Sequence, residues 1–214
     1  MRRFLRFENA PVTGALLILI CVIYGLTTFD KNEVLYRFGA IDARLITQHE
    51  YWRAVTGMFL HANLVHLLAN AFSLWQLGTL YEVMFGSRRF AFIYFTTGII
   101  ASLASALFTF GPSVGASGAV LGILGAFIFS ILRSPQWRHE RWTRSLIAQL
   151  IFWAAVNLLL PLEIKNIDSV AHIAGLISGL ILGLLPHRVP PPPPGGAIID
   201  LGPGVDPAAR TAGR

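Results

Sequence analysis

Charged residues are scarce in this chain of 214 residues. Aspartate, glutamate, lysine and arginine make up 13% of the sequence, whereas hydrophobic residues make up 54%. An ordinary soluble domain carries about 25% charged residues. Too few charges are available to cover the surface of a freely soluble globule of this size, so the composition argues against that class of protein.

Cysteine is scarcer still, because Cys21 is the sole cysteine and it lies in an apolar run. A disulfide framework, a cysteine-based zinc site and a dithiol redox motif all need at least two cysteines and are therefore excluded. Acidic residues are also few, and the formal net charge is +6. A basic chain can bind nucleic acid, but the positions of the basic residues have another explanation, given below. We expect no nucleic-acid partner.

Long apolar stretches are abundant. Six of them approach the 20 or so residues that a helix needs to cross a hydrocarbon core, and helix is the expected state because backbone groups in lipid must be satisfied within the segment. The sequence therefore predicts an all-α membrane protein with six transmembrane helices. The stretches are Pro11–Phe29, Asn63–Phe85, Phe90–Phe110, Gly115–Leu132, Thr143–Leu162 and Ser169–Leu185.

The basic residues give the six helices a direction. With the N-terminus inside, 12 of the 17 lysine and arginine residues fall in the inner segments and five fall in the outer loops. Cytoplasmic loops of membrane proteins carry such an excess. We therefore expect an integral multi-pass membrane protein, in a bacterial inner (plasma) membrane, with both termini in the cytoplasm.

Three parts of the chain follow from this topology. Residues 1–10 form a short cytoplasmic N-terminus, and residues 11–186 form one six-helix domain whose long outer loop spans residues 30–62. The tail, residues 187–214, contains five consecutive prolines and then glycines. Proline runs lack backbone donors and favour the polyproline II conformation, so we expect a disordered cytoplasmic tail.

Polar side chains occur in three of the stretches, although polar groups are costly in a bilayer. The second stretch has His66 and Asn70 near its start, and His61 lies just before it. His66 and Asn70 share one helical face because they are four residues apart. The fourth begins near Ser117, and the sixth contains His172. All three helices run from outside to inside. These residues therefore lie at a similar depth, which predicts one shared polar site near the outer face.

Small residues spaced at helical intervals explain how that site comes together. Such residues let helix backbones approach closely in membranes, so we expect the fourth and sixth helices to pack together. Projection places Ser117 at the edge of the contact, with His172 on the facing helix. The small residues are Gly118, Gly122 and Gly125 in the fourth stretch, and Gly175, Gly179 and Gly183 in the sixth.

A serine beside a neutral histidine is the arrangement of an activated nucleophile. The histidine takes the hydroxyl proton as general base and returns it to the leaving amine. Donors for the oxyanion are also needed, and the candidates are the Asn70 amide, the His66 ring and the Ser117 main-chain N–H. Asp168, one turn before His172, is a candidate to orient the ring, but its place in a loop favours a solvated acid.

Together these motifs resemble the rhomboid family of intramembrane serine proteases. The resemblance covers residues 50–185, and the motifs occur in the expected order. They are Trp52-Arg53, His61, His66-xxx-Asn70, Glu82 after Gly78, Gly115-x-Ser117-Gly118 and Ala171-His172-xx-Gly175-xxx-Gly179.

The resemblance implies a six-helix fold and a Ser117–His172 dyad without an essential acid, metal or cofactor. It implies an oxyanion site formed by His66, Asn70 and the Ser117 N–H. Its substrates would be transmembrane proteins cut at or near their outer end, within membrane lipid. The fifth helix and the loop after it would form a lateral gate, with Phe152 or Trp153 as a candidate part of it.

The resemblance also separates structural from catalytic residues. Glu82 lies near the inner face, too deep to reach Ser117, and we expect it and Trp52-Arg53 to be structural. One departure concerns the position four residues after the serine. Many relatives have an aromatic residue there that stacks on the base histidine, whereas this chain has Leu121. The sequence does not indicate an oligomeric state or a natural substrate.

Three other classes compete with the protease. The first is a rhomboid-like protein that has lost catalysis and binds membrane helices as a chaperone, although such relatives usually lack the serine or the histidine. The second is a metal-dependent protease or transporter using His61, His66 and His172, but the chain has no His-Glu-x-x-His motif and no carboxylate at that depth. The third is a polar-lined channel, for which Ser117 would scarcely matter.

Overall fold

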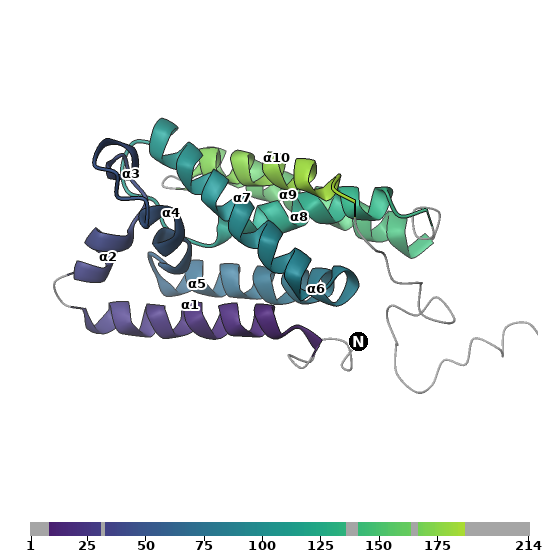
Figure 1. Ribbon diagram of the computed structural model, residues 1–214, viewed down its shortest axis with the longest axis horizontal. Coiled ribbons are helices and arrows are strands. Elements are labelled where there is room, and N and C mark those ends of the chain that lie inside the picture. Colours follow the sequence, from purple (N-terminus) through teal and green to yellow (C-terminus); the bar gives the residue numbers. More distant parts are fainter. Residues whose placement is uncertain (1–8, 31–32, 136–140, 164–166, 187–214) are drawn as a thin grey trace, which may run out of the picture.

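A computed structural model describes residues 9–30, 33–135, 141–163 and 167–186 (Figure 1). The tail expected over residues 187–214 and most of the expected N-terminal segment lie outside the described residues. Within the described part of the chain the secondary structure is helical, and the β-type pairing consists of one isolated bridge between Ile41 and Ser113. The predicted all-α class is therefore confirmed.

Helices occupy all six predicted stretches. By length and composition, α1 and α7 can each cross a membrane, and a third span results if the segments Arg53–Phe59 and Leu64–Phe85, bent by 97°, count as one. The other apolar helical stretches are shorter, so the number of six spans stays a prediction; they are Ser117–Leu132, Thr143–Leu159 and Ser169–Gly183. The bounds are α1 Pro11–Phe29, α5 Leu64–Ser73, a π-helical segment Leu74–Gly78, α6 Thr79–Phe85, α7 Ser87–Phe108, α8 Ser117–Leu132, α9 Arg141–Glu163 and α10 Ser169–Gly183.

The helix α8 lies at the centre of the bundle. Twelve of its 16 residues are buried, and it packs mainly against α10 and α7. By contrast, large apolar side chains are exposed on outward faces of the other helices, such as Ile18 of α1 and Phe152 of α9. Exposed apolar faces on helices of this length suit contact with lipid rather than with water.

The outer loop predicted over residues 30–62 is folded into short helices at one end of the bundle (Figure 1). These are α2 Val34–Gly39, α3 Arg44–Thr47, α4 Arg53–Thr56 and a 3-10 turn Gly57–Phe59. Arg53 is buried, and its guanidinium donates to the carbonyls of Arg37 at 3.0 Å and Ala40 at 2.7 Å. Trp52 stacks on Phe38 with ring centroids 5.2 Å apart. Both side chains therefore hold the loop together, as expected.

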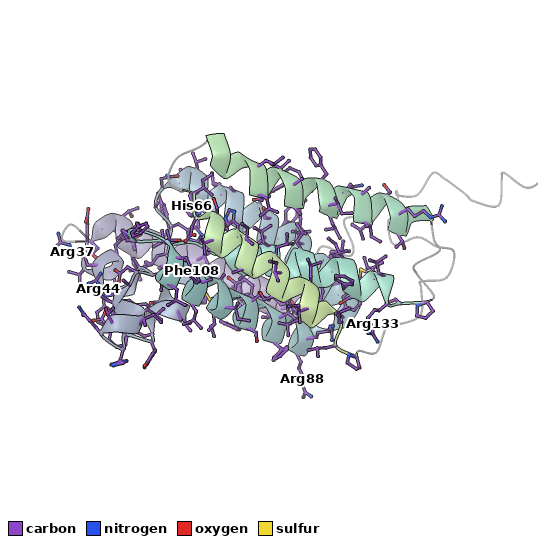
Figure 2. The ribbon with its side chains drawn as sticks, turned by 90° about the horizontal axis from the view of Figure 1, so that it is seen from above. Arg37, Arg44, His66, Arg88, Phe108 and Arg133 are labelled. Carbon is purple, nitrogen blue, oxygen red and sulfur yellow. The ribbon has the colours of Figure 1, made fainter. Side chains whose placement is uncertain are left out.

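Arginine side chains mark the two ends of the bundle (Figure 2). Arg37 and Arg44 lie at the end that holds the short helices, and Arg88 and Arg133 lie at the opposite end. At that opposite end, Arg89 donates to the Tyr81 hydroxyl at 2.9 Å and to the Ser130 hydroxyl at 3.3 Å. It also donates to main-chain carbonyls at the C-terminal end of α10, namely those of Leu182 and Leu185. One side chain thus ties α6, α8 and α10 together.

Glu82 fixes the N-terminus of α1 from a distance of about 70 residues along the chain. Its carboxylate accepts hydrogen bonds from the main-chain N–H groups of Val12 at 3.0 Å and Thr13 at 2.8 Å, and from the Thr13 hydroxyl at 2.7 Å. Those N–H groups have no partner within α1 because they belong to its first turn. A negative charge is also favoured at a helix N-terminus. The expected structural role of Glu82 agrees with these contacts.

Replacing Glu82 by alanine should destabilise the fold by about 3 kcal/mol, because the change leaves two buried donors and one partly buried donor without an acceptor. Thr13→Val is the matched control, since it removes only the hydroxyl bond and should cost about 1 kcal/mol. Thermal unfolding of the two purified variants beside the wild type measures the difference. Equal losses in both variants would show that the main-chain contacts of Glu82 contribute little.

Candidate active site

Ser117 is the first residue of α8, and the loop before it is pinned to the outer segment. The Gly115 N–H donates to the Gly57 carbonyl at 2.9 Å, and Ser113 pairs with Ile41 through two main-chain hydrogen bonds. Gly115 has a φ of +124°, a conformation that side chains disfavour. No side-chain hydrogen bond caps the N-terminus of α8. The serine hydroxyl therefore sits on a fixed turn beside N–H groups of a helix N-terminus that no side chain caps.

The structure places Ser117 against His172 of α10. The Ser117 Oγ lies 2.9 Å from the His172 Nε2. Ser117 is half-buried, and the His172 side chain is 6% exposed. A hydroxyl and an imidazole nitrogen at this separation form a hydrogen bond along which a proton can move.

The glycine stripes bring these helices into backbone contact. A Cβ on Gly175 would overlap the carbonyl of Gly118, and a Cβ on Gly179 would overlap the carbonyl of Gly122. One turn further on, a Cβ on Gly183 would lie 2.7 Å from the Ala126 carbonyl oxygen. Only glycine permits this approach, which places Ser117 within reach of the histidine on the facing helix.

The second nitrogen of the His172 ring is also engaged. His172 Nδ1 lies 3.1 Å from the main-chain carbonyl oxygen of Asn157 in α9. A carbonyl oxygen only accepts, so Nδ1 must carry the proton, and Nε2 is then free to accept from the Ser117 hydroxyl. This is the tautomer that a general base needs.

Asp168 has a different role from the one considered from sequence. Its carboxylate caps α10 by accepting from the Ala171 N–H at 2.9 Å, and it also accepts from the hydroxyls of Ser105 and Thr109 at the end of α7. Burial acts to raise the pKa of Asp168, but these hydrogen bonds outweigh it and hold the pKa below its usual value. Asp168 therefore joins α10 to α7 as an ionised group and does not orient His172.

His66 and Asn70 lie against the loop that leads to Ser117. A Cβ on Gly115 would be 2.8 Å from His66 Nε2 and 3.7 Å from Asn70 Nδ2. The Asn70 amide donates to the carbonyl of His66 at 3.0 Å, and the buried His61 ring lies edge-on to the His66 ring at 5.2 Å. His66 and Asn70 thus meet the serine loop two residues before Ser117, and His61 packs behind His66.

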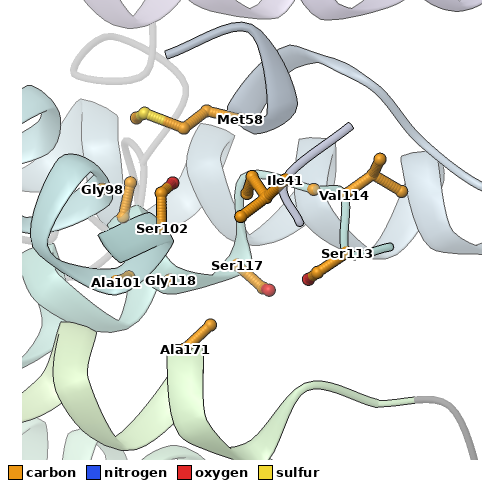
Figure 3. Close-up of a pocket in the computed structure, with 12 residues that line it drawn as sticks. Ile41, Met58, Gly98, Ala101, Ser102, Ser113, Val114, Ser117, Gly118 and Ala171 are labelled. Carbon is orange, nitrogen blue, oxygen red and sulfur yellow. The ribbon is translucent and has the colours of Figure 1, made fainter. Parts of the chain in front are cut away.

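A small pocket opens beside the nucleophile (Figure 3). Its walls come from the outer segment, α7, the serine loop, α8 and α10, and they include the side chains of Ser102, Ser113 and Ser117. Met58 and Ala171 supply apolar parts of the wall. The pocket therefore combines hydroxyl groups with small apolar groups next to Ser117.

Two features near His172 differ from or extend the sequence-based expectations. Leu121 is 2% exposed, and no aromatic ring stacks on His172 within the described part of the chain. Instead, hydrogen bonds at both ring nitrogens hold the imidazole. The Asn157 acceptor was not predicted, because a main-chain carbonyl leaves no signature in residue type. Pro161, four residues after it, is the one available signal.

Among the described residues, no group of three or more histidine, cysteine, aspartate or glutamate side chains is placed to hold a metal ion.

The fold and the site together define the class: this is a helical membrane bundle in which a serine and a histidine near one end form a hydrogen bond. Comparison with known families agrees, since the model of the Rhomboid domain matches residues 48–189. The chain belongs to the rhomboid family, and it is an integral membrane protein.

Curated relatives have the same family assignment. The chain is 39% identical over 179 residues to the "Rhomboid protease GluP" of Bacillus subtilis (strain 168), covering 81% of this chain and 34% of the relative. It is 36% identical over 157 residues to "RHOMBOID-like protein 6, mitochondrial" of Arabidopsis thaliana, covering 72% of this chain and 50% of the relative. The "Putative rhomboid protease YdcA" of Bacillus subtilis (strain 168) is 30% identical over 195 residues, 85% of this chain and 95% of the relative. The chain thus spans from a third to a half of the first two relatives.

Proposed function

We propose that this protein is an intramembrane serine protease in which Ser117 is the nucleophile and His172 the general base. The observation that carries the proposal is the 2.9 Å contact between Ser117 Oγ and His172 Nε2. The names of two of the relatives, which include the word protease, support the same activity. Because both groups are retained and in contact, the proposal favours catalysis over a chaperone that only binds membrane helices.

The reaction follows from the positions of the protons. Ser117 Oγ attacks the carbonyl carbon of the scissile peptide while His172 Nε2 takes the hydroxyl proton. The tetrahedral intermediate then collapses, and the imidazolium gives that proton to the leaving nitrogen, which departs as an amine. Water, deprotonated by the same nitrogen, hydrolyses the acyl-enzyme and frees Ser117. Nδ1 keeps its proton throughout, and this N–H donates to the Asn157 carbonyl.

The developing oxyanion needs donors near the serine. The N–H of Ser117 at the start of α8, the His66 ring and the Asn70 amide are the proposed donors. His66 and Asn70 both border Gly115, and a helix N-terminus favours negative charge. In this structure the Asn70 amide donates to the carbonyl of His66. This hydrogen bond holds the amide beside the loop that leads to Ser117.

Asn70→Ala should lower kcat by about 100-fold and leave KM nearly unchanged, because the amide acts mainly once negative charge has developed. Steady-state cleavage of a single-span model substrate in detergent micelles gives both constants. His66→Ala, measured in parallel, should also lower kcat. Unchanged kcat in both variants, with unfolding temperatures equal to that of the wild type, would remove these residues from the oxyanion site.

The proposed substrate is a transmembrane protein, cut at or near its outer end, in the lipid that surrounds the bundle. Six membrane spans are proposed, with both termini in the cytoplasm of a bacterial cell. The excess of lysine and arginine in the predicted inner segments, 12 against five in the outer loops, supports this direction. Arg88 and Arg133 of those inner segments lie at the end of the bundle opposite to Arg37 and Arg44 (Figure 2). Phe152 and Trp153 are exposed on α9, where a lateral gate would admit the substrate.

A fluorophosphonate probe tests the proposal directly, since it reacts with an activated serine. The purified protein should be labelled at Ser117, as located by mass spectrometry of its peptides, and labelling should prevent substrate cleavage. Ser117→Ala should abolish the label, whereas Ser145→Ala, which changes an exposed serine of α9, should retain it. Cleavage that persists in the Ser117→Ala protein would end the assignment of a serine protease with Ser117 as its nucleophile.

A further inference from the structure

The helix α9 contains a proline at a position where proline is unfavourable. Pro161 lies within α9, which runs from Arg141 to Glu163. A proline in a helix interior removes the hydrogen bond to the carbonyl four residues earlier and costs about 3 kcal/mol. The residue four positions before Pro161 is Asn157. The acceptor deprived of its helical partner is therefore the carbonyl that His172 contacts.

We propose that Pro161 releases the main-chain carbonyl of Asn157 so that it positions the base, in the role that an acidic side chain fills in a serine–histidine–aspartate triad. This inference rests on the proposed function of the same site. The 3.1 Å separation between His172 Nδ1 and the Asn157 oxygen is within hydrogen-bond range. The carbonyl fixes both the ring orientation and the tautomer, so that Nε2 faces Ser117 without a proton.

Among the residues whose side chains the structure describes, the other polar groups near the ring do not fill this role. The nearest carboxylate in sequence, Asp168, is engaged by the Ala171 N–H and by the hydroxyls of Ser105 and Thr109. The Asn157 side chain is occupied as well, because its amide donates to the Trp153 carbonyl at 2.8 Å. The acceptor for Nδ1 is thus a main-chain atom, and its availability depends on residue 161 rather than on the side chain of residue 157.

The bond also connects catalysis to the placement of α9. The base is on α10 and the nucleophile is on α8, and these helices contact each other through glycine backbones. The positioning carbonyl is on a third helix with an exposed apolar face. The ring is therefore correctly oriented only when α9 lies in the position seen here, so a shift of α9 changes the tautomer without separating Ser117 from α10.

Two variants test the proposal. Pro161→Ala restores an N–H that competes for the Asn157 carbonyl, and it should lower kcat by about 10-fold with little change in KM, the size expected for a lost positioning bond. The double variant Leu160→Pro/Pro161→Leu keeps one proline in the helix but releases the Val156 carbonyl instead, and it should lower kcat similarly. Pro11→Ala is the control, because the first position of α1 has no helical acceptor to compete for, and its kcat should equal that of the wild type.

Nitrogen-15 spectra of histidine-labelled protein give a readout that is independent of activity. The resonances of His172, assigned by comparison with the His172→Ala protein, should show a protonated Nδ1 in the wild type and a loss of that state in both proline variants. A wild-type ring protonated at Nε2 would overturn the proposal, as would unchanged tautomer and kcat in Pro161→Ala. If instead Ser117→Ala retains cleavage, the protease assignment fails, while the spectra still decide whether the carbonyl holds the ring.

Discussion

Ser117→Ala, His172→Ala and the double variant should all lose activity by the same large factor, at least about 1,000-fold in kcat. The two side chains share one proton across a 2.9 Å contact, and neither performs the step alone. Losses of residues that act as a unit do not add, so the double variant should be no worse than either single variant. Steady-state cleavage of a single-span substrate, followed to long reaction times, measures the residual rates.

The same variants should remain folded and inserted. Neither side chain belongs to the glycine contact between α8 and α10, so unfolding temperatures should stay within a few degrees of the wild-type value. A double variant whose loss equals the product of the single losses would mean that the residues act independently. Equal activity in all three variants and the wild type would assign both residues to packing.

Gly179→Ala should reduce both stability and activity, because the added methyl group meets main-chain atoms that cannot move aside. Its Cβ would lie 2.7 Å from the Cα and from the carbonyl carbon of Gly122 and would overlap the carbonyl oxygen. Forcing the helices apart should cost about 3 kcal/mol of unfolding free energy. It should also lengthen the distance between Ser117 and His172, so kcat should fall well beyond any loss of folded protein.

Gly25→Ala is the matched control, since it makes the same substitution in the interior of another helix. A Cβ at Gly25 meets no atom within 4 Å, and alanine is the better helix former by up to about 1 kcal/mol. Unfolding followed by circular dichroism should therefore show Gly25→Ala at or above the wild-type stability, with normal cleavage. Similar behaviour of the two glycine variants would contradict the close contact of α8 and α10.

Much of the helical architecture could be predicted because lipid imposes a simple rule on apolar runs. The first predicted stretch, Pro11–Phe29, coincides with α1, where proline stands at the first helical position. The prediction missed the π-helical segment within the second stretch and the 97° bend before it. Hydropathy reports how long a segment is, but it does not report a local change in hydrogen-bond pattern.

At the candidate site, the contact between two side chains could be predicted from the sequence, whereas the contact with a main-chain carbonyl could not. Depth and glycine spacing predicted that Ser117 and His172 would meet, and the distance between them agrees. Projection placed Ser117 at the edge of the helix contact, and the long histidine side chain spans the remaining gap. The Asn157 carbonyl could not be anticipated from residue identity, because every residue has one, and only the proline four positions later distinguishes it.

The contact between α8 and α10 repeats itself every four residues, and the repetition leaves the relative height of the helices undetermined. Gly175, Gly179 and Gly183 face the small residues Gly118, Gly122 and Ala126 of α8. Sliding α10 by four residues, about 6 Å, would again set small residues against small residues while moving the base one turn away from the nucleophile. Hydrogen bonds at the two ends of α10 fix one of these registers. Asp168 ties one end to α7, and Arg89 holds the other. A protein that loses both anchors can stay helical and closely packed and still hold its two reactive groups at different levels.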